Sequence, residues 1–224
     1  MISLLLSLAL LQQEPEPQTS EPAAQAEAPA AAEQAPAEAA PLDREAALAG
    51  INAYLNSIET LRARFMQVAP DGSAASGELA LARPGRLRFE YDDPSPIRIV
   101  ADGTTLAIED QALETVDRVP LRSTPLWWIL KSDIDLAEDA ELVGMEREFG
   151  FLYLTLRDAN EDVEGEVMFV FAEPSYELRE WFVTDALGEV TRVTLADVET
   201  GISLNPRLFL VPEPEDRRDS RRGR

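Results

Sequence analysis

The sequence predicts a mainly β (α+β) fold: one sheet of about eleven antiparallel strands, apolar on one face and covered there by helices. Short segments in which apolar and polar residues alternate follow one another along most of the chain, and turns rich in Gly and Asp separate them. Such short turns join antiparallel neighbours, which excludes a parallel sheet with crossover helices. A sheet of so many strands has to curl.

One amphipathic helix precedes the strands. Asp43 is suited to cap its N-terminus, and Glu45 lies in the first turn, where a negative charge is favourable. The residues of its apolar stripe recur at helical spacing: Leu48, Ile51, Leu55 and Ile58, with Tyr54 and Leu61 beside them. That stripe has to pack on another part of the fold.

The expected strands cover residues 61–68, 77–83, 86–91, 97–101, 104–108, 113–119, 141–148, 151–157, 166–172, 178–184, 190–198 and 207–211. Asp102-Gly103, between two short apolar runs, predicts a two-residue hairpin loop. In the second and third of these strands, alternation places the Leu, Phe and Tyr side chains on one face. The other face carries Glu78, Arg86, Arg88 and Glu90. One face of the sheet is therefore apolar and needs a cover.

A second helical segment lies between the two groups of strands. Thr124 is suited to cap it, and Pro125 suits its first position. The next five residues, 126–130, are apolar nearly all round, and Lys131 favours the C-terminal end. A helix of this kind has to be buried on several sides or line a cavity. It is a candidate cover for the apolar face.

The composition excludes several classes of function. The 224 residues include 42 acidic and 20 basic side chains, a net charge of −22, and no His or Cys. A Ser-His-Asp triad, a Cys nucleophile, a Cys/His zinc site and a disulfide are therefore excluded, and the acidic charge argues against nucleic acid as a partner. Adjacent acidic pairs such as Asp92-Asp93 point to opposite faces of a strand, and Lys131 beside Ser132 is a poor basis for a hydrolase. We expect no catalytic residue, no metal and no cofactor, and hence no enzyme.

The folded domain is expected to span residues 42–212. Residues 1–11 contain an apolar run that is too short to span a bilayer and resembles a signal peptide, which predicts export. Residues 12–41 are an expected disordered linker, because residues 14–41 hold eleven Ala, six Pro and six Glu and no large apolar side chain. Residues 213–224 are a polar tail that we also expect to be disordered.

From Leu61 onward the sequence resembles the LolA family, the periplasmic carriers of outer-membrane lipoproteins. Residues 61–67 are similar to the family's first strand, 77–89 to a strand that ends in Arg-Pro, 99–106 to an Asp-Gly hairpin and 124–130 to a Thr-Pro helix. The four pieces occur in the family's order and at its spacing. The resemblance implies an unclosed half-barrel with a helical lid over its apolar concave face, which binds the acyl chains of lipoproteins without bond chemistry.

The resemblance also implies site residues. In the family, the Arg of the Arg-Pro pair, here Arg83, reaches across the concavity and latches the lid by hydrogen bonds to the helix backbone; its parity agrees, because Arg83 shares a face with Leu79 and Leu81. The alternative is that Arg83 ends a strand and points to solvent.

The implied acyl-chain cavity is lined by Leu55, Phe65, Leu79, Leu81, Leu87, Phe89, Leu106, Ile108, Leu126, Trp127, Trp128 and Leu130. The same residues would also suit an ordinary core. Ala80 and Ala107 stand where the family commonly has aromatic residues, and we expect them to enlarge or reshape the pocket.

The implied partners are acylated outer-membrane lipoproteins, an inner-membrane ATP-driven transporter that releases them, and an outer-membrane receptor if one is present. We expect a soluble periplasmic monomer that binds no nucleic acid. Two binding alternatives stay open: a lipid- or lipoprotein-sensing regulatory domain of the same fold, and the outer-membrane lipoprotein receptor itself. That receptor, LolB, needs an acylated Cys, which this chain lacks, so the carrier is preferred. A lipid-processing enzyme would need a nucleophile with a base, and the absence of His disfavours it.

Overall fold

The computed structural model describes residues 41–158 and 165–211. The signal-peptide-like segment, the expected linker up to residue 40 and the polar tail lie outside the described residues. All elements below belong to one unit of the chain, Leu42–Arg224. Within the described ranges, no helix is both long enough and apolar enough to cross a membrane.

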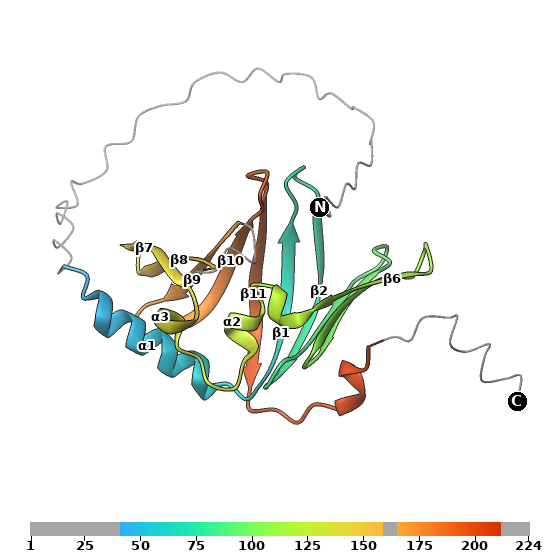
Figure 1. Ribbon diagram of the computed structural model, residues 1–224, viewed down its shortest axis with the longest axis horizontal. Coiled ribbons are helices and arrows are strands. Elements are labelled where there is room, and N and C mark those ends of the chain that lie inside the picture. Colours follow the sequence, from blue (N-terminus) through green and yellow to red (C-terminus); the bar gives the residue numbers. More distant parts are fainter. Residues whose placement is uncertain (1–40, 159–164, 212–224) are drawn as a thin grey trace, which may run out of the picture. The chain divides into compact units, whose positions relative to one another are not determined.

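Eleven strands form a single antiparallel sheet in the order β6-β5-β4-β3-β2-β1-β11-β10-β9-β8-β7 (Figure 1). Their bounds are β1 (Thr60–Val68), β2 (Ala74–Ala82), β3 (Arg86–Tyr91), β4 (Ile97–Asp102), β5 (Thr105–Asp110), β6 (Thr115–Pro120), β7 (Glu141–Glu148), β8 (Phe151–Arg157), β9 (Glu166–Ala172), β10 (Glu177–Thr184) and β11 (Val190–Thr200). Each strand pairs with its neighbours in the chain, except that β1 also pairs with β11 and that β6 and β7, although consecutive, form the two edges. The sheet is therefore unclosed, and the predicted fold class is confirmed.

Three helices lie on the inner side of the curved sheet (Figure 1). Helix α1 (Arg44–Ser57) precedes β1, and the long connection from β6 to β7 contains the 3₁₀ turn η1 (Leu121–Ser123), α2 (Trp127–Leu130) and α3 (Leu136–Asp139). We call residues 121–140 the cover segment. Its chain starts at one edge strand of the sheet and ends at the other, and Figure 1 shows that it crosses the inner face.

Helix α1 begins as the sequence predicts. The Asp43 carboxylate accepts a hydrogen bond from the Ala46 amide at 3.0 Å, which satisfies one of the free N–H groups of the first turn. Ile51 and Leu55 are buried against the sheet. Gly50 lies under the ring of Tyr176, from the turn between β9 and β10, so closely that a Cβ would be 2.3 Å from the ring. The β9–β10 turn therefore packs directly on the helix.

Helix α2 begins later than the sequence predicts. The Thr124 hydroxyl donates a hydrogen bond back to the Leu121 carbonyl at 2.7 Å, so it is not the cap. The N-cap position is Leu126, which has no side-chain cap, and the helix is a single turn. Trp128, Ile129 and Leu130 are nevertheless buried as expected.

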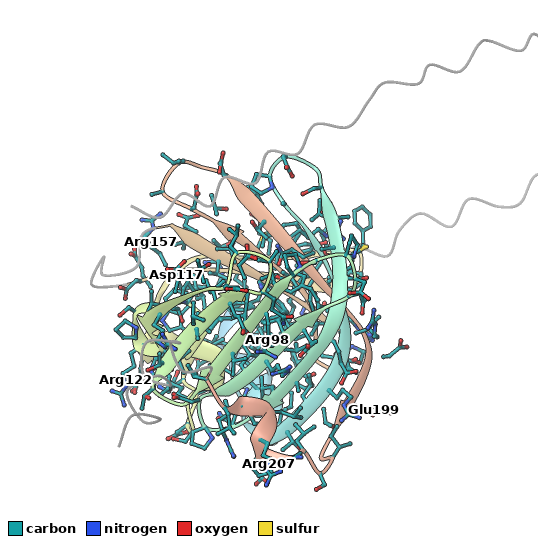
Figure 2. All side chains as sticks on the ribbon, turned by 90° about the vertical axis from the view of Figure 1, so that its right-hand side faces the viewer. Arg98, Asp117, Arg122, Arg157, Glu199 and Arg207 are labelled. Carbon is teal, nitrogen blue, oxygen red and sulfur yellow. The ribbon has the colours of Figure 1, made fainter. Side chains whose placement is uncertain are left out.

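The predicted strand over residues 207–211 is wrong. This segment contains the 3₁₀ turn η2 (Pro206–Phe209), in which the Asn205 side chain accepts a hydrogen bond from the Arg207 amide at 3.0 Å. The fixed φ of Pro206 at the first position and the Asn cap favour a helical turn over an extended strand. Phe209 is buried on the outer face of the sheet, against Ala80 and Ala82. Figure 2 looks onto this outer face, with Arg98 near its centre and Arg207 at its lower end.

The Asp-Gly hairpin is present but shifted by one residue. Asp102 still belongs to β4, and its carboxylate accepts hydrogen bonds from the Thr104 and Thr105 amides, each at 2.9 Å. The loop residues are therefore Gly103 and Thr104. Gly103 has φ +110°, a conformation that favours glycine.

The inner face of β1, β2 and β3 is close-packed around Phe65. The Phe65 ring meets Phe89 and Tyr91 edge-on, with ring centroids 5.0 Å apart in both pairs. Gly77 pairs with Phe65 across the strands and leaves room for the ring. A Cβ at Gly77 would lie 2.1 Å from the Glu90 carbonyl oxygen and 2.6 Å from the Phe65 ring.

Replacing Gly77 by alanine should therefore destabilise the fold. The new methyl group has to displace backbone in β3, and overpacking of this kind costs about 2 kcal/mol or more. Gly144→Ala in β7 is the matched control, because nothing lies within 4 Å of a Cβ there, and it should be neutral or slightly stabilising. Chemical denaturation of both variants measures the difference; equal free energies of unfolding would contradict the packing described.

Candidate functional site

The inner face of the sheet is a continuous apolar surface built by strand alternation. Across β2 and β3, Leu79 lies opposite Phe89 and Leu81 opposite Leu87. Nine of the residues expected to line the acyl-chain cavity are buried in one cluster: Leu55, Phe65, Leu79, Leu81, Leu87, Phe89, Leu106, Trp128 and Leu130. The cluster continues into β8, β9 and β10, so the apolar face extends to both sides of the β1–β11 pair.

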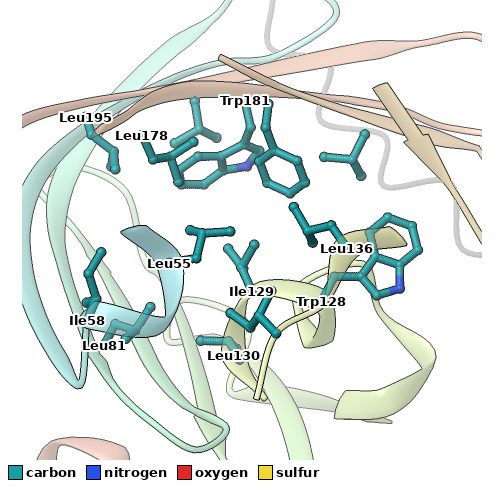
Figure 3. Packing of buried hydrophobic residues seen from close by; sticks show 14 of the residues in the cluster. Leu55, Ile58, Leu81, Trp128, Ile129, Leu130, Leu136, Leu178, Trp181 and Leu195 are labelled. Carbon is teal, nitrogen blue, oxygen red and sulfur yellow. The ribbon is translucent and has the colours of Figure 1, made fainter. Parts of the chain in front are cut away.

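Helix side chains fill the space on this face. Leu130 and Leu136 are 0% exposed and Leu55 is 2% exposed. Figure 3 shows Leu55 and Ile129 in the layer of side chains between the helices and β10, below Leu178 and Trp181. The face is therefore covered and packed, and a ligand could reach it only where helix side chains withdraw.

Three expected lining residues are less enclosed. Leu126 and Trp127 are half-buried and pack against the cluster, and the Arg122 guanidinium lies over the Trp127 ring at 4.8 Å from its centroid. Ile108 is half-buried and is not part of the cluster, because it faces Asp117 of the edge strand β6. It lies on β5, next to the edge strand of the sheet.

The expectation that Ala80 and Ala107 reshape the pocket is wrong. Ala80 packs with Phe209 on the outer face, and the register through Arg88 and Val100 places Ala107 on that same face. The strand period of two puts both small residues on the side away from the helices. They leave room for η2 and its neighbours rather than for a ligand on the inner face.

Arg83 lies in the turn between β2 and β3 and connects three elements. Its Nε donates to the Ile129 carbonyl at 3.0 Å, and its Nη1 donates to the Leu55 carbonyl. The neighbouring Gly85 amide donates to the Leu130 carbonyl at 2.7 Å. We call these three contacts the Arg83 junction. At the ends of α1 and α2, Arg83 and Gly85 supply donors to three carbonyls: those of Ile129 and Leu130, and that of Leu55, which also accepts from the Ile58 amide at 3.3 Å.

The charge of Arg83 suits this position. Burial lowers the pKa of Arg83 to about 10, so the guanidinium remains charged at neutral pH. None of the ion pairs found in the described part of the chain involves it, so its partners are carbonyl dipoles. A positive charge at helix C-termini is favourable. Its assignment as a latch stays a prediction.

Gly85 allows the backbone of the junction to adopt its conformation. Its φ is +72°, and a Cβ there would lie 2.6 Å from the Cα of Gly103 in the next hairpin. The two turns at this end of the sheet therefore pack backbone to backbone. That close approach aims the Gly85 amide at the end of α2.

Sequence reasoning missed a second set of polar contacts to the cover segment. The Asn56 side chain donates to the Ile134 carbonyl at 2.8 Å and accepts from the Ile134 amide at 2.9 Å. Asn52 accepts from the Leu136 amide at 3.2 Å and donates to the Asp135 carboxylate at 3.3 Å. The signal was present: two Asn four residues apart inside an otherwise good helix, where Asn is a poor helix former.

The remaining polar groups of the site do not form a reactive constellation. Lys131, at the end of α2, pairs with Asp139, which also accepts from the Asp135 amide at 3.1 Å. In the part of the chain that the structure describes, no group of three or more Asp or Glu side chains is placed to hold a metal ion. Burial raises the pKa of Tyr91 to about 12, and its hydroxyl donates to the Gln67 side chain at 2.7 Å. The Lys131–Asp139 pair connects α2 with α3, and the Tyr91–Gln67 hydrogen bond joins β3 to β1, so both are structural contacts.

Comparison with known proteins gives consistent matches over the same region. The family described as outer membrane lipoprotein carrier protein LolA matches residues 56–211. An outer-membrane lipoprotein carrier protein from Methylococcus capsulatus is 29% identical over 173 residues, which are 73% of this chain and 82% of that protein. One from Legionella pneumophila is 30% identical over 176 residues, 74% of this chain and 85% of that protein. The solved structure of a LolA superfamily protein from Nitrosomonas europaea is 13% identical with a TM-score of 0.42, and covers 73% of this chain and 97% of that one.

Replacing Arg83 by leucine should loosen the end of α2 without unfolding the protein. The variant removes the Arg83 donor from the Ile129 carbonyl and one of two donors from the Leu55 carbonyl, but it also removes a buried charge. The closed position of the cover is therefore destabilised more than the fold as a whole. Because the chain has no Cys, a Leu130→Cys background allows the opening to be measured as the rate of thiol labelling. We expect a roughly tenfold faster rate with Arg83→Leu.

Arg86→Leu is the matched control for this experiment. Arg86 is three residues further on, and its guanidinium lies over Phe209 on the outer face, so its loss should leave the labelling rate unchanged. Equal rates for Arg83→Leu and the unsubstituted background would remove the latch assignment.

Proposed function

The chain belongs to the LolA family, and on that premise we propose that it is a periplasmic carrier that binds the acyl chains of outer-membrane lipoproteins on the inner face of its sheet. The observation that supports this most is the arrangement of that face. It is a wide apolar surface, and what covers it is a set of short helices that hydrogen bonds hold at their ends. A cover held by a few hydrogen bonds can be displaced by a ligand that offers the same apolar contacts.

The free energy of acyl chains in water explains why a carrier is needed. Each exposed CH₂ group costs about 0.8 kcal/mol, so a chain of a dozen such groups costs on the order of 10 kcal/mol. Lipoproteins cannot leave a membrane at useful rates against that barrier. A carrier lowers the barrier by offering an apolar surface in place of the bilayer.

Exchange of cover for cargo is the proposed binding mechanism. The side chains of Leu55, Leu130 and Leu136 occupy the surface in the closed form, and acyl methylenes would replace them. This is a substitution of one apolar group for another, so its net free energy is small compared with that of transferring the cargo from water. The hydrogen bonds of Arg83 then help to set how tightly the cargo is held, and release remains feasible.

The proposed route follows from the family. The carrier would receive lipoproteins from an inner-membrane ATP-driven transporter and deliver them to an outer-membrane receptor, with residues 1–11 directing export and residues 42–212 forming the carrier domain. The carrier would bind each lipoprotein and pass it on without making or breaking a covalent bond. A net charge of −22 fits this role, because it keeps the protein from adhering to anionic membrane surfaces.

A synthetic triacylated lipopeptide tests the proposed function directly. In the full chain with Trp181→Phe, the fluorescence of Trp127 and Trp128 reports on the cover, since both lie in it and Trp181 no longer contributes. We expect a saturable change near one equivalent, because the cover moves when acyl chains occupy the inner face.

The same peptide without acyl chains is the control and should give no change. If the folded, lipid-free protein shows no acyl-dependent saturation, the inner face is an ordinary core and the carrier function is wrong.

A further inference from the structure

Two asparagines of α1 hold the other end of the cover segment. Asn52 and Asn56 are four residues apart and therefore lie on the same face of the helix. Together they make four hydrogen bonds with residues 134–136, at 2.8, 2.9, 3.2 and 3.3 Å. Three of the four involve backbone groups of the cover segment. The contacts therefore depend on where that backbone lies more than on which side chains it carries.

The backbone at this point needs such partners. Ile134 and Leu136 are 2% and 0% exposed, so their side chains enter the core while the chain between α2 and α3 has no regular structure. Backbone N–H and C=O groups beside a core are costly without hydrogen bonds. An Asn side chain carries a donor and an acceptor, so Asn56 satisfies both groups of Ile134 as a neighbouring strand would.

These contacts are separate from the Arg83 junction. The junction binds the last carbonyls of α2, whereas the asparagines bind the start of α3, and the two sets share no hydrogen-bonding group. Lys131, Ser132 and Asp133 lie between them. The Lys131–Asp139 ion pair couples the two short helices, whereas residues 131–135 between them have no regular structure, which allows one end to lift while the other remains in place.

We propose that Asn52 and Asn56 form a second anchor, which holds the α3 end of the cover segment on α1 independently of Arg83. They are positioning residues, and the inference rests on the proposed function, in which the cover has to move for acyl chains to enter. Opening then has two steps, one at each end of the segment. Cargo reaches the whole inner face only when both ends are released.

The test measures each end of the cover segment separately, without lipid. In the full chain, Leu130→Cys reports the α2 end and Leu136→Cys reports the α3 end, because both leucines are 0% exposed and the chain has no Cys of its own. The combined Asn52→Ala and Asn56→Ala substitutions should raise thiol labelling about tenfold at position 136 and less than twofold at position 130. Arg83→Leu should give the opposite pattern.

Loss of helix α1 does not explain such a result. Alanine has a higher helix propensity than asparagine, so the helix itself should be slightly more stable in the variant. Ser57→Ala is the control on the same helix, since its hydroxyl donates to the Tyr54 carbonyl of its own helix, and it should change neither labelling rate. The free energy of unfolding is measured in parallel to confirm that labelling reports the cover and not global unfolding.

Two results would overturn the second anchor. Equal acceleration at both reporters would mean that the segment opens as one rigid piece, and no acceleration at position 136 would mean that the asparagines do not hold it. Neither result bears on lipid binding, which is measured separately with the triacylated lipopeptide. The closed cover competes with cargo. If the carrier function is also correct, combining Arg83→Leu with the two Asn→Ala substitutions should therefore raise lipopeptide affinity by the product of the fold-increases that each change gives alone.

Discussion

The apolar inner face of the sheet has to be kept from water, and the chain has few segments that can do so. The turns between neighbouring strands are short, and the connection from β6 to β7 is the longest between strands of the sheet. That connection and the helix before β1 are the segments that cover the face. Because they cross an apolar surface and stop there, their backbone ends lie among apolar side chains and need hydrogen-bond partners from elsewhere.

Few hydrogen-bond partners hold the cover segment, so a ligand can displace it. Arg83 and Gly85 supply donors at the end of α2, and Asn52 and Asn56 supply partners before α3. The Leu121 amide at the start of the segment also donates to the Thr104 carbonyl at 2.8 Å, and apolar packing, which acyl chains can replace at little net cost, adds to these contacts. A small number of hydrogen bonds therefore decides whether the face is open or closed, while the buried area decides how much cargo the face can shelter.

Much of the fold follows from the local pattern of the sequence, and the differences have local causes. Alternation is strong where one face is buried, so the bounds of β3, β7, β8 and β9 agree with prediction. It fails at residues 207–211, where Pro206 and an Asn cap produce a 3₁₀ turn with equally apolar side chains. The apolar residues of the site follow from strand parity, and the same parity places Ala80 on the outer face. The asparagine contacts join segments about 80 residues apart, and nothing in the local pattern specifies such a pairing.

The central claim is that cargo displaces the cover from the Arg83 junction, and hydrogen exchange at the Gly85 amide tests it most directly. That amide is bonded to the Leu130 carbonyl of α2, whereas the nearby Arg83 amide is bonded to the Glu59 carbonyl and serves as an internal reference. On saturation with a triacylated lipopeptide, the account predicts faster exchange at Gly85 and unchanged exchange at Arg83. Unchanged or slower exchange at Gly85, with lipopeptide bound, would show that cargo binds without moving α2 and would contradict the account.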